Sequence, residues 1–337
     1  MMSVFIIECA GATLAGKYLA YPSVGASVWS FLGTLAGTPV FLGTGFLYIW
    51  IFIIPLPFAL ITFLGCCIFH DSPKFLYLEK GKAEKAKRAA ASYRGLAEST
   101  PTEEEEEEQI GQDDWTFRKP LILCIVLHLT TNSIGSLISA QYATGILLSL
   151  GVHVDSAQYV SAFAIQLPGV FAAILSSRLI RQGRRRWEAI GCSVGIVGNV
   201  LMLCSGVLGG YSAALGLVCM RVGCSLGPSM IARAMPGEAA PQAARASIVM
   251  VSVFCGETLG TCVTWLFPLL HYELGTLVFI FPLAALLGLG SWLWFHMPET
   301  QGKSVDQVLE EMLHRNQTGG LEDSSESLLS ERTALLQ

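Results

Sequence analysis

Long apolar stretches separated by short polar turns dominate this chain of 337 residues. A helix needs about 20 mainly apolar residues to cross the hydrocarbon core of a bilayer. Eight stretches meet that requirement, and we predict that each forms a membrane-spanning helix. They cover residues 23–44, 46–69, 120–150, 157–180, 187–208, 211–235, 244–270 and 274–296.

The polar positions divide these spans into a group of two and a group of six. A long polar segment between the groups holds an amphipathic helix pattern over residues 80–93. It also holds the acidic run Glu103–Glu108, which we interpret as a solvated linker. The predicted regions are a remnant of an N-terminal bundle with two full spans (residues 1–70), the cytoplasmic linker 71–119, the six-helix bundle 120–297 and the cytoplasmic tail 298–337.

Lysine and arginine are distributed on one side of the predicted spans only. They occupy the linker, the turn at Arg184–Arg186, the turn at Arg245 and the tail from Lys303. Cytoplasmic loops of membrane proteins carry an excess of these residues, so we expect these segments and the C-terminus in the cytosol. The opposite turns, which contain no lysine or arginine, are 43–46, 151–156, 208–212 and 270–274.

Composition excludes a water-soluble enzyme. Hydrophobic residues make up 52% of the chain and charged residues only 14%, against roughly 25% charged in soluble domains. The ten cysteines lie in apolar stretches without a CxxC pair, which is typical of small core residues. We find no catalytic constellation, phosphate loop or metal-ligand cluster, so no catalytic residue, metal, cofactor or nucleic-acid partner is expected.

Four short motifs follow the ends of spans in a fixed order. They resemble the PESPRFL, RxGRR, ExxPxxxR and PETKG motifs of the sugar porters in the major facilitator superfamily. The closest likeness is to animal facilitative glucose transporters and their relatives. The resemblance implies an all-α, polytopic membrane protein with a partial major facilitator fold of about eight spans, two plus six. The motifs are Asp71–Leu76, Arg181–Arg185, Glu238–Arg245 and Pro298–Lys303.

The resemblance also implies a cytoplasmic gate. In the family, acids and arginines at the cytoplasmic span ends pair across the two bundles and part when the carrier changes state. Arg181, Arg184 and Arg185 could alternatively serve as a topology signal alone. The implied gating residues are Glu8, Arg181, Arg184, Arg185, Glu238, Arg245 and Glu299.

The likeness covers about residues 8–311, the later two thirds of a family member. We therefore expect the chain to lack the first three spans and most of the fourth. Glu8 stands where a first-half motif begins, but the proline and arginine positions of that motif are Gly11 and Ala15. A truncated family member that no longer transports is thus an open alternative.

The family's sugar-binding residues are mostly replaced. Thr131 and Asn132 stand at a glutamine pair, Arg233 and Glu257 stand at two tryptophans, and Gln166 lies near an asparagine position. Polar residues recur on one side of the span 120–150, as a cavity wall or as helix–helix hydrogen-bonding groups. The candidate substrate-binding residues are His128, Thr131, Asn132, Gln141, Gln166 and Glu257.

Arg221 and Glu257 are charged residues deep within apolar spans. At ~1.5 Å per residue they lie about 13 and 10 Å below the outer surface. A lone charge at such depth costs at least ~2.5 kcal/mol. We therefore predict a buried ion pair with a carboxylate–guanidinium separation below ~5 Å, or else polar neighbours for each.

These patterns predict transport of a small solute, most readily a sugar or polyol, by alternating access through a lipid bilayer. The alternatives are the truncated non-transporting family member and an organic-ion carrier. The tail residues Glu331, Leu335 and Leu336 resemble the acidic dileucine pattern that clathrin adaptors bind. This pattern favours the plasma membrane or an endosomal or lysosomal membrane.

Overall fold

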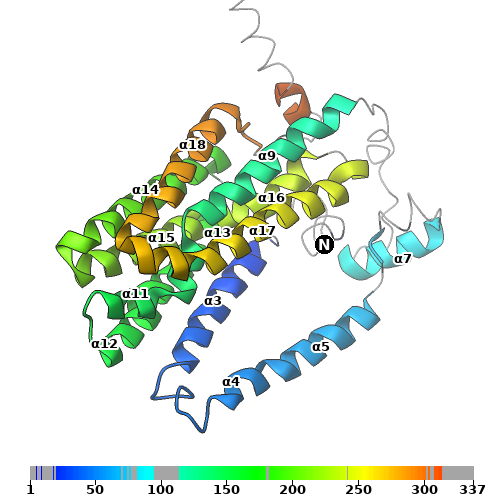
Figure 1. Cartoon of the computed structure of the whole chain (residues 1–337). Coiled ribbons are helices and arrows are strands. Elements are labelled where there is room, and N and C mark those ends of the chain that lie inside the picture. Colours follow the sequence, from blue (N-terminus) through cyan, green and yellow to red (C-terminus); the bar gives the residue numbers. More distant parts are fainter. Residues whose placement is uncertain are drawn as a thin grey trace, which may run out of the picture.

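The computed structural model is a bundle of helices (Figure 1). It describes residues 20–69, 71–73, 82–94, 114–179, 182–240, 242–300 and 307–312, together with residues 5, 9, 18, 76 and 303. Within these residues the ordered elements are helical and no strand occurs. The all-α class expected from the sequence is therefore confirmed.

Each of the eight expected spans contains helix. The first group holds α3 (Ala20–Ala36), α4 (Ile49–Ile53) and α5 (Pro55–Ile68), and the linker holds α7 (Ala83–Arg94). The second group begins with α9 (Asp114–Ser133), α10 (Ser136–Gln141), α11 (Ala143–Ser149), α12 (Val154–Tyr159), the π-helix η1 (Val160–Gln166) and α13 (Leu167–Leu179). It continues with α14 (Arg184–Leu208), α15 (Gly210–Leu226), α16 (Pro228–Ala239), α17 (Gln242–Leu274), the 3₁₀ helix η3 (Gly275–Phe279) and α18 (Ile280–His296).

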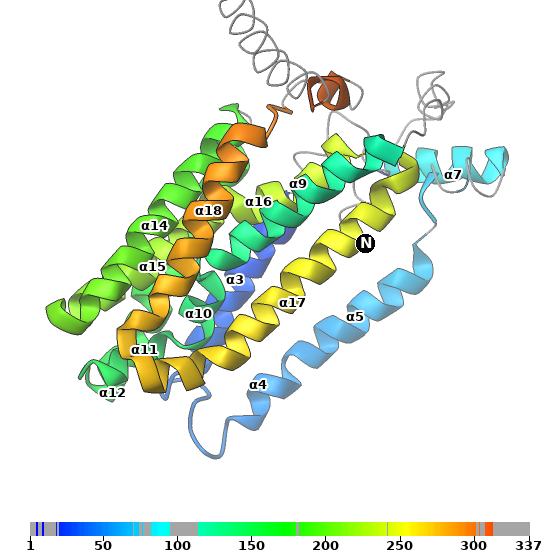
Figure 2. The same cartoon turned by 45° about the horizontal axis from the view of Figure 1, so that its top comes forward.

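Five helical segments of the described residues are long and apolar enough to cross a membrane. The last of them contains two helices, α17 and α18, which η3 joins into a hairpin (Figure 2). The shorter α3 and the interrupted run α9–α11 are further helices at positions where the sequence predicts spans. The five segments are Ile49–Ile68, Val154–Leu179, Arg184–Leu208, Gly210–Ala239 and Ala244–His296.

Two expected continuous spans are broken near their centres. Helix α9 ends before Gly135, whose φ of +87° is a conformation that glycine adopts without strain. Helix α15 ends at Gly227, and Pro228 then occupies the first turn of α16, where its missing N–H costs nothing. At the first break the Ile134 carbonyl accepts a hydrogen bond from the Asn199 amide of α14 at 3.2 Å, and at the second the Gly227 carbonyl accepts from the Met230 and Ile231 N–H groups.

The first group of spans meets the second through one helix. Helix α3 packs against η1, α13 and α16. It ends at Ala36 rather than at residue 44, because Gly37 and Pro39 follow and do not favour helix. Helices α4 and α5 follow one another end to end, bury none of their residues and lie apart from α17 in Figure 2. Phe58 of α5 contacts the Trp29 ring of α3.

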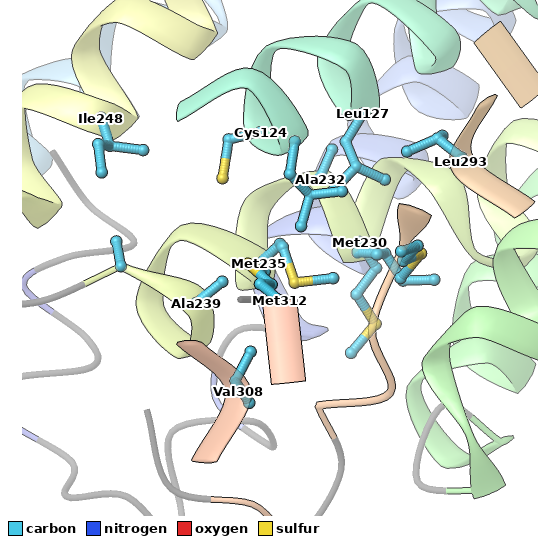
Figure 3. Close-up of a cluster of buried hydrophobic side chains, with 14 of the residues drawn as sticks. Cys124, Leu127, Met230, Ala232, Met235, Ala239, Ile248, Leu293, Val308 and Met312 are labelled. Carbon is cyan, nitrogen blue, oxygen red and sulfur yellow. The ribbon is translucent and has the colours of Figure 1, made fainter. Parts of the chain in front are cut away.

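The two largest apolar clusters lie among helices α9–α18, called the six-helix bundle below. One lies around Ile138, Leu217 and Phe279. The other joins α9, α16, α17 and α18 to the short helical segment at residues 307–312 (Figure 3). This second cluster fixes the chain that follows α18 onto the bundle. Its labelled members are Cys124, Leu127, Met230, Ala232, Met235, Ala239, Ile248, Leu293, Val308 and Met312.

Candidate functional site

Charged motif residues gather at one end of the six-helix bundle. This end, called the basic end below, comprises the start of α14, the end of α16 and the segment after α18. Arg184 forms an ion pair with Glu238. The Thr300 hydroxyl donates to Glu238 Oε2 at 2.8 Å. Glu238 thus links three segments that are far apart in the sequence.

Glu299 caps helix α14. Its carboxylate accepts hydrogen bonds from the backbone N–H groups of Arg184, at 3.0 Å, and Arg185, at 3.4 Å. The first N–H groups of a helix lack partners within the helix, and they carry partial positive charge. Gly183, at the N-cap, has φ +130° and no side chain of its own to cap the helix. The cap therefore comes from the PETQG segment, 115 positions later in the chain.

Two further candidate gating residues are also anchored at this end. The Arg185 guanidinium donates to the Trp294 carbonyl and lies 4.8 Å from the centre of the Trp294 ring. Arg245 is buried and donates to the Ala240 carbonyl at 3.2 Å. Glu8 and Arg181 lie outside the described residues.

The pairing at the basic end differs from what the family motifs imply. The resemblance implies contacts across two bundles, whereas Arg184, Glu238 and Glu299 connect elements of the six-helix bundle to one another. The reason is geometric, since the end of α16 and the segment after α18 both meet the start of α14. This network stabilises the base of a single bundle.

The polar side of α9 is engaged mostly in hydrogen bonds to backbone. His128 Nδ1 lies 3.0 Å from the Cys124 carbonyl, and the Thr131 hydroxyl donates to Leu127 at 2.8 Å. Asn132 instead reaches another helix, because its amide donates to the Gly256 carbonyl of α17 at 2.9 Å. Asn132 therefore joins two helices, whereas the Thr131 hydrogen bond stays within α9.

A row of hydroxyl groups on α3 faces the six-helix bundle. Ser23, Ser27, Ser30 and Thr34 follow one another at intervals of four, three and four residues, which places them on one face. Ser30 donates to Gln166 Oε1 at 3.3 Å, and Arg233 Nη1 donates to Ser23 Oγ at 3.3 Å. We call these four residues the hydroxyl stripe. Sequence reasoning missed it, although the helical spacing was a signal.

Gln166, at this interface, and Arg221, beside α13, each have a buried nitrogen without a hydrogen-bond partner in the described ranges. Gln166 is fully buried, and its Nε2 has no hydrogen-bond partner among the described residues. The Arg221 side chain lies along α13, with Cγ only 2.7 Å from where a Cβ on Gly169 would be. Arg221 Nε is also buried without a hydrogen-bond partner in the described part of the chain. Buried donors of this kind are costly unless a ligand or water satisfies them.

The ion-pair form of the prediction for Arg221 and Glu257 is wrong, whereas the alternative, polar neighbours for each residue, stays a prediction. No salt bridge joins the two side chains, both of which lie in described ranges, and Glu257 is exposed. The reason is the direction of the side chains around their helices. Helix α15 packs mainly on α14 and α13, whereas α17 packs mainly on α9. Similar depth in the bundle therefore does not bring the two charges together.

The remaining candidate residues separate into two places. His128 lies within electrostatic reach of Arg233 and Glu257, so these three belong to one polar region. Gln141, at the end of α10, is exposed and forms no hydrogen bond with another candidate residue in the described ranges. Arg233 was not among the predicted site residues, even though it stands at an aromatic position of the family's sugar site.

Comparison with solved structures shows the fold. The major facilitator superfamily proton:xylose symporter XylE, bound to 6-bromo-6-deoxy-D-glucose, superposes with a TM-score of 0.73 at 18% identity. The match covers 92% of this chain and 70% of XylE. A double tryptophan mutant of XylE gives a TM-score of 0.74 at 17% identity. The chain has a major facilitator fold.

Sequence relatives are facilitated glucose transporters. Member 14 of Homo sapiens is 26% identical over 264 residues, which are 73% of this chain and 50% of that protein. Member 3 of Oryctolagus cuniculus is 24% identical over 327 residues, 90% and 65% of the two chains. Member 7 of Mus musculus is 27% identical over 304 residues, 84% and 57%. The chain spans about half to two thirds of the length of these relatives.

The sequence matches one transporter family over nearly its whole length. The sequence profile of the family "Sugar (and other) transporter" matches residues 1–312, nearly the whole chain. The apolar helices and the fold make the protein a multi-pass integral membrane protein of a transporter family, not an enzyme. We conclude that this chain belongs to the sugar (and other) transporter family.

Proposed function

We propose that this protein carries a small polyhydroxylated solute, a sugar or polyol, across a membrane by alternating access. The observation that carries the proposal is the hydroxyl stripe of α3, which faces Gln166 and Arg233 of the six-helix bundle. This contact lies between the two groups of spans. Alternating access requires such an interface to bind the solute and to rearrange around it.

The chemistry of this interface suits a hydroxylated solute. Sugar hydroxyls both donate and accept, so a matching site offers neutral groups of both kinds. Ser23, Ser27 and Ser30 can do both, and Gln166 Nε2 is a buried donor with no partner in the described ranges. We propose that His128, Asn132 and Glu257 line the adjacent wall of the same path, and we leave Thr131 and Gln141 out of it.

We further propose that the basic end acts as the cytoplasmic gate. Arg184, Glu238 and Glu299 hold the base of the six-helix bundle together, which supports its movement as one rigid unit. Arg185 and Arg245 anchor the neighbouring helix ends. Glu8 and Arg181 are proposed as gate residues from the family motifs alone.

Uptake by the purified chain in proteoliposomes tests the proposed function. We expect saturable uptake of at least one of labelled glucose, xylose or sorbitol, above that of liposomes without protein. Gln166→Ala should reduce this uptake, because it removes the buried amide that meets the hydroxyl stripe. The control Gln141→Ala changes an exposed glutamine of α10 that we leave out of the path, and it should transport normally.

Two uptake results would contradict parts of this proposal. Absence of saturable uptake of any polyhydroxylated solute, neutral or acidic, by monodisperse protein would rule out transport by this chain. Equal uptake by the Gln166→Ala and Gln141→Ala variants would remove Gln166 from the path while leaving transport itself in place.

For location, we propose an endosomal or lysosomal membrane with recycling through the plasma membrane. The support is the dileucine pattern of Glu331, Leu335 and Leu336, which lies outside the described residues. Replacing Leu335 and Leu336 by alanine should move a fluorescently tagged chain toward the cell surface. An unchanged distribution would exclude adaptor binding through this pattern.

A further inference from the structure

Two arginines of the six-helix bundle carry positive charge that the proposed function does not use. Arg233 of α16 donates to Ser23, and Arg221 of α15 lies along Gly169 of α13. Both are within electrostatic reach of Cys224, which is buried on α15 between them in sequence. The two guanidinium groups therefore bring positive charge to the same region of the six-helix bundle, and Arg233 brings its charge to the contact with α3.

Neither guanidinium has a carboxylate partner in the described part of the chain. Glu257 is exposed on α17 and lies near His128, without a salt bridge to either arginine. Glu188 is the other carboxylate near Cys224, but it is buried on α14. Its Oε1 lies 3.7 Å from the Cys192 thiol of the same helix.

An arginine within a bundle of spans is unfavourable unless a counter-charge or a polar cavity compensates it. The one hydrogen bond that Arg233 makes to α3 meets a serine hydroxyl, which is neutral. The Nε of Arg221 has no partner in the described ranges. This region thus holds two positive charges, that of Arg233 at the contact with α3, whose compensation the described protein residues do not supply.

We infer that the transported solute is itself the counter-charge, a polyhydroxylated carboxylate such as an aldonic or uronic acid. This inference rests on the proposed function and names its substrate class. Arg233 is the direct carboxylate ligand, because its guanidinium is partly exposed and already reaches α3. Arg221 adds to the positive field, and Gln166 with Ser27 and Ser30 meets the hydroxyl groups.

The dimensions of the interface agree with such a solute. Ser23 and Ser30 are seven residues apart on α3, which corresponds to about 10 Å along the helix. Arg233 meets the first of them and Gln166 meets the second. A carboxylate at one end and hydroxyls toward the other end of a six-carbon sugar acid match this order of charged and neutral groups.

Transport selectivity in proteoliposomes tests the inference. We expect the full chain to take up labelled gluconate or glucuronate in preference to glucose and sorbitol. Arg233→Gln should lower that preference by roughly tenfold or more, because hydrogen bonds to charged groups contribute ~1.5–3 kcal/mol. The control Arg178→Gln alters an exposed arginine of α13 and should keep the preference.

A second measurement needs no variant. Uptake of a carboxylate without a coupled ion moves negative charge inward, so an inside-positive potassium diffusion potential should accelerate gluconate uptake. Sorbitol uptake should not respond to the potential. The potential response separates charge transport from any folding defect in the Arg233→Gln protein.

The uptake results distinguish failure of the sugar-acid inference from failure of the proposed transport function. Uptake of neutral sugars or polyols with no uptake of the acids would overturn the inference and leave the proposed function intact. The same holds if Arg233→Gln and Arg178→Gln retain equal preference and gluconate uptake ignores the potential. Absence of uptake of both classes would overturn the proposed function itself.

Discussion

Asn132 differs from its polar neighbours on α9 in what it connects. The Thr131 hydroxyl donates to a carbonyl one turn earlier in its own helix. The Asn132 amide spans from the His128 carbonyl, at 3.1 Å, to the Gly256 carbonyl of α17, at 2.9 Å. Only the Asn132 hydrogen bonds join two spans, so we expect Asn132 to contribute more to the stability of the bundle than Thr131 does.

We predict that Asn132→Ala lowers the thermal stability of the detergent-solubilised protein more than Thr131→Ala does. Removing a hydrogen bond between spanning helices costs about 0.6–2 kcal/mol. Thr131→Ala removes only a bond within one turn, and alanine favours helix. The measurement is the unfolding temperature of each variant; a Thr131→Ala protein that melts at or below the Asn132→Ala protein would contradict the assignment.

The residues also show what spacing along a chain can and cannot predict. The motif order placed Arg184 and Glu238 at the ends of spans on one side, and the structure pairs them there within a single bundle. Depth alone suggested a pair between Arg221 and Glu257, but the direction of each side chain depends on which helices pack together. The hydroxyl stripe escaped notice because serine and threonine are common in spans, and only the position of α3 against η1 gives them meaning.

At the scale of elements, helices α14 and α15 approach each other closely at small residues. A Cβ on Gly198 would lie 2.9 Å from the Gly216 carbonyl oxygen and 2.9 Å from the Met220 nitrogen. Backbone atoms cannot move aside as the end of a flexible side chain can. Small residues at such crossings let helix backbones approach closely within membranes.

Gly198→Ala should therefore destabilise the bundle, by about 1–3 kcal/mol if the helices separate to admit the methyl group. The matched control is Gly288→Ala in α18, where a Cβ would meet no atom within 4 Å. Alanine there should be neutral or stabilising, since glycine is a weaker helix former. Chemical denaturation in detergent measures both variants. Equal stabilities would show that α14 and α15 can repack without cost.

The sequence predicts where spanning helices occur, but it does not predict where a helix is interrupted. A stretch of twenty or more apolar residues predicts a span, and every expected span contains helix. The interruption at Gly135 and the π-helical turn of η1 depend on packing and local backbone geometry. Apolar periodicity does not report either one, because the residues on both sides remain apolar.

At the scale of the molecule, the charged segments gather at one end. Lys119 of α9 donates to the Met312 carbonyl at 3.0 Å, so the chain after α18 and the start of α9 share the end that holds Arg184. His153, which is exposed before α12, belongs to a turn without lysine or arginine. The positive-inside rule then assigns the two ends to opposite sides of the membrane.

We predict that a cysteine at position 153 reacts with a membrane-impermeant maleimide added to intact cells, and that a cysteine at position 303 does not. The variants His153→Cys and Lys303→Cys both change exposed residues, so reactivity reports sidedness. Labelling is compared with the parent chain, which already has ten cysteines. Reaction at 303 without reaction at 153 would invert the topology.

The cap on α14 has a consequence for the order in which the protein assembles during synthesis. Arg184 leaves the ribosome 115 residues ahead of Glu299, a delay of roughly 6–23 s at ~5–20 residues per second. Until then the first turn of α14 lacks the carboxylate that completes it, and Gly183 offers no substitute. The cap on α14 can therefore form only after translation has passed α18. A nascent chain that stops before Glu299 would keep an uncapped α14, which chaperones and proteases could recognise.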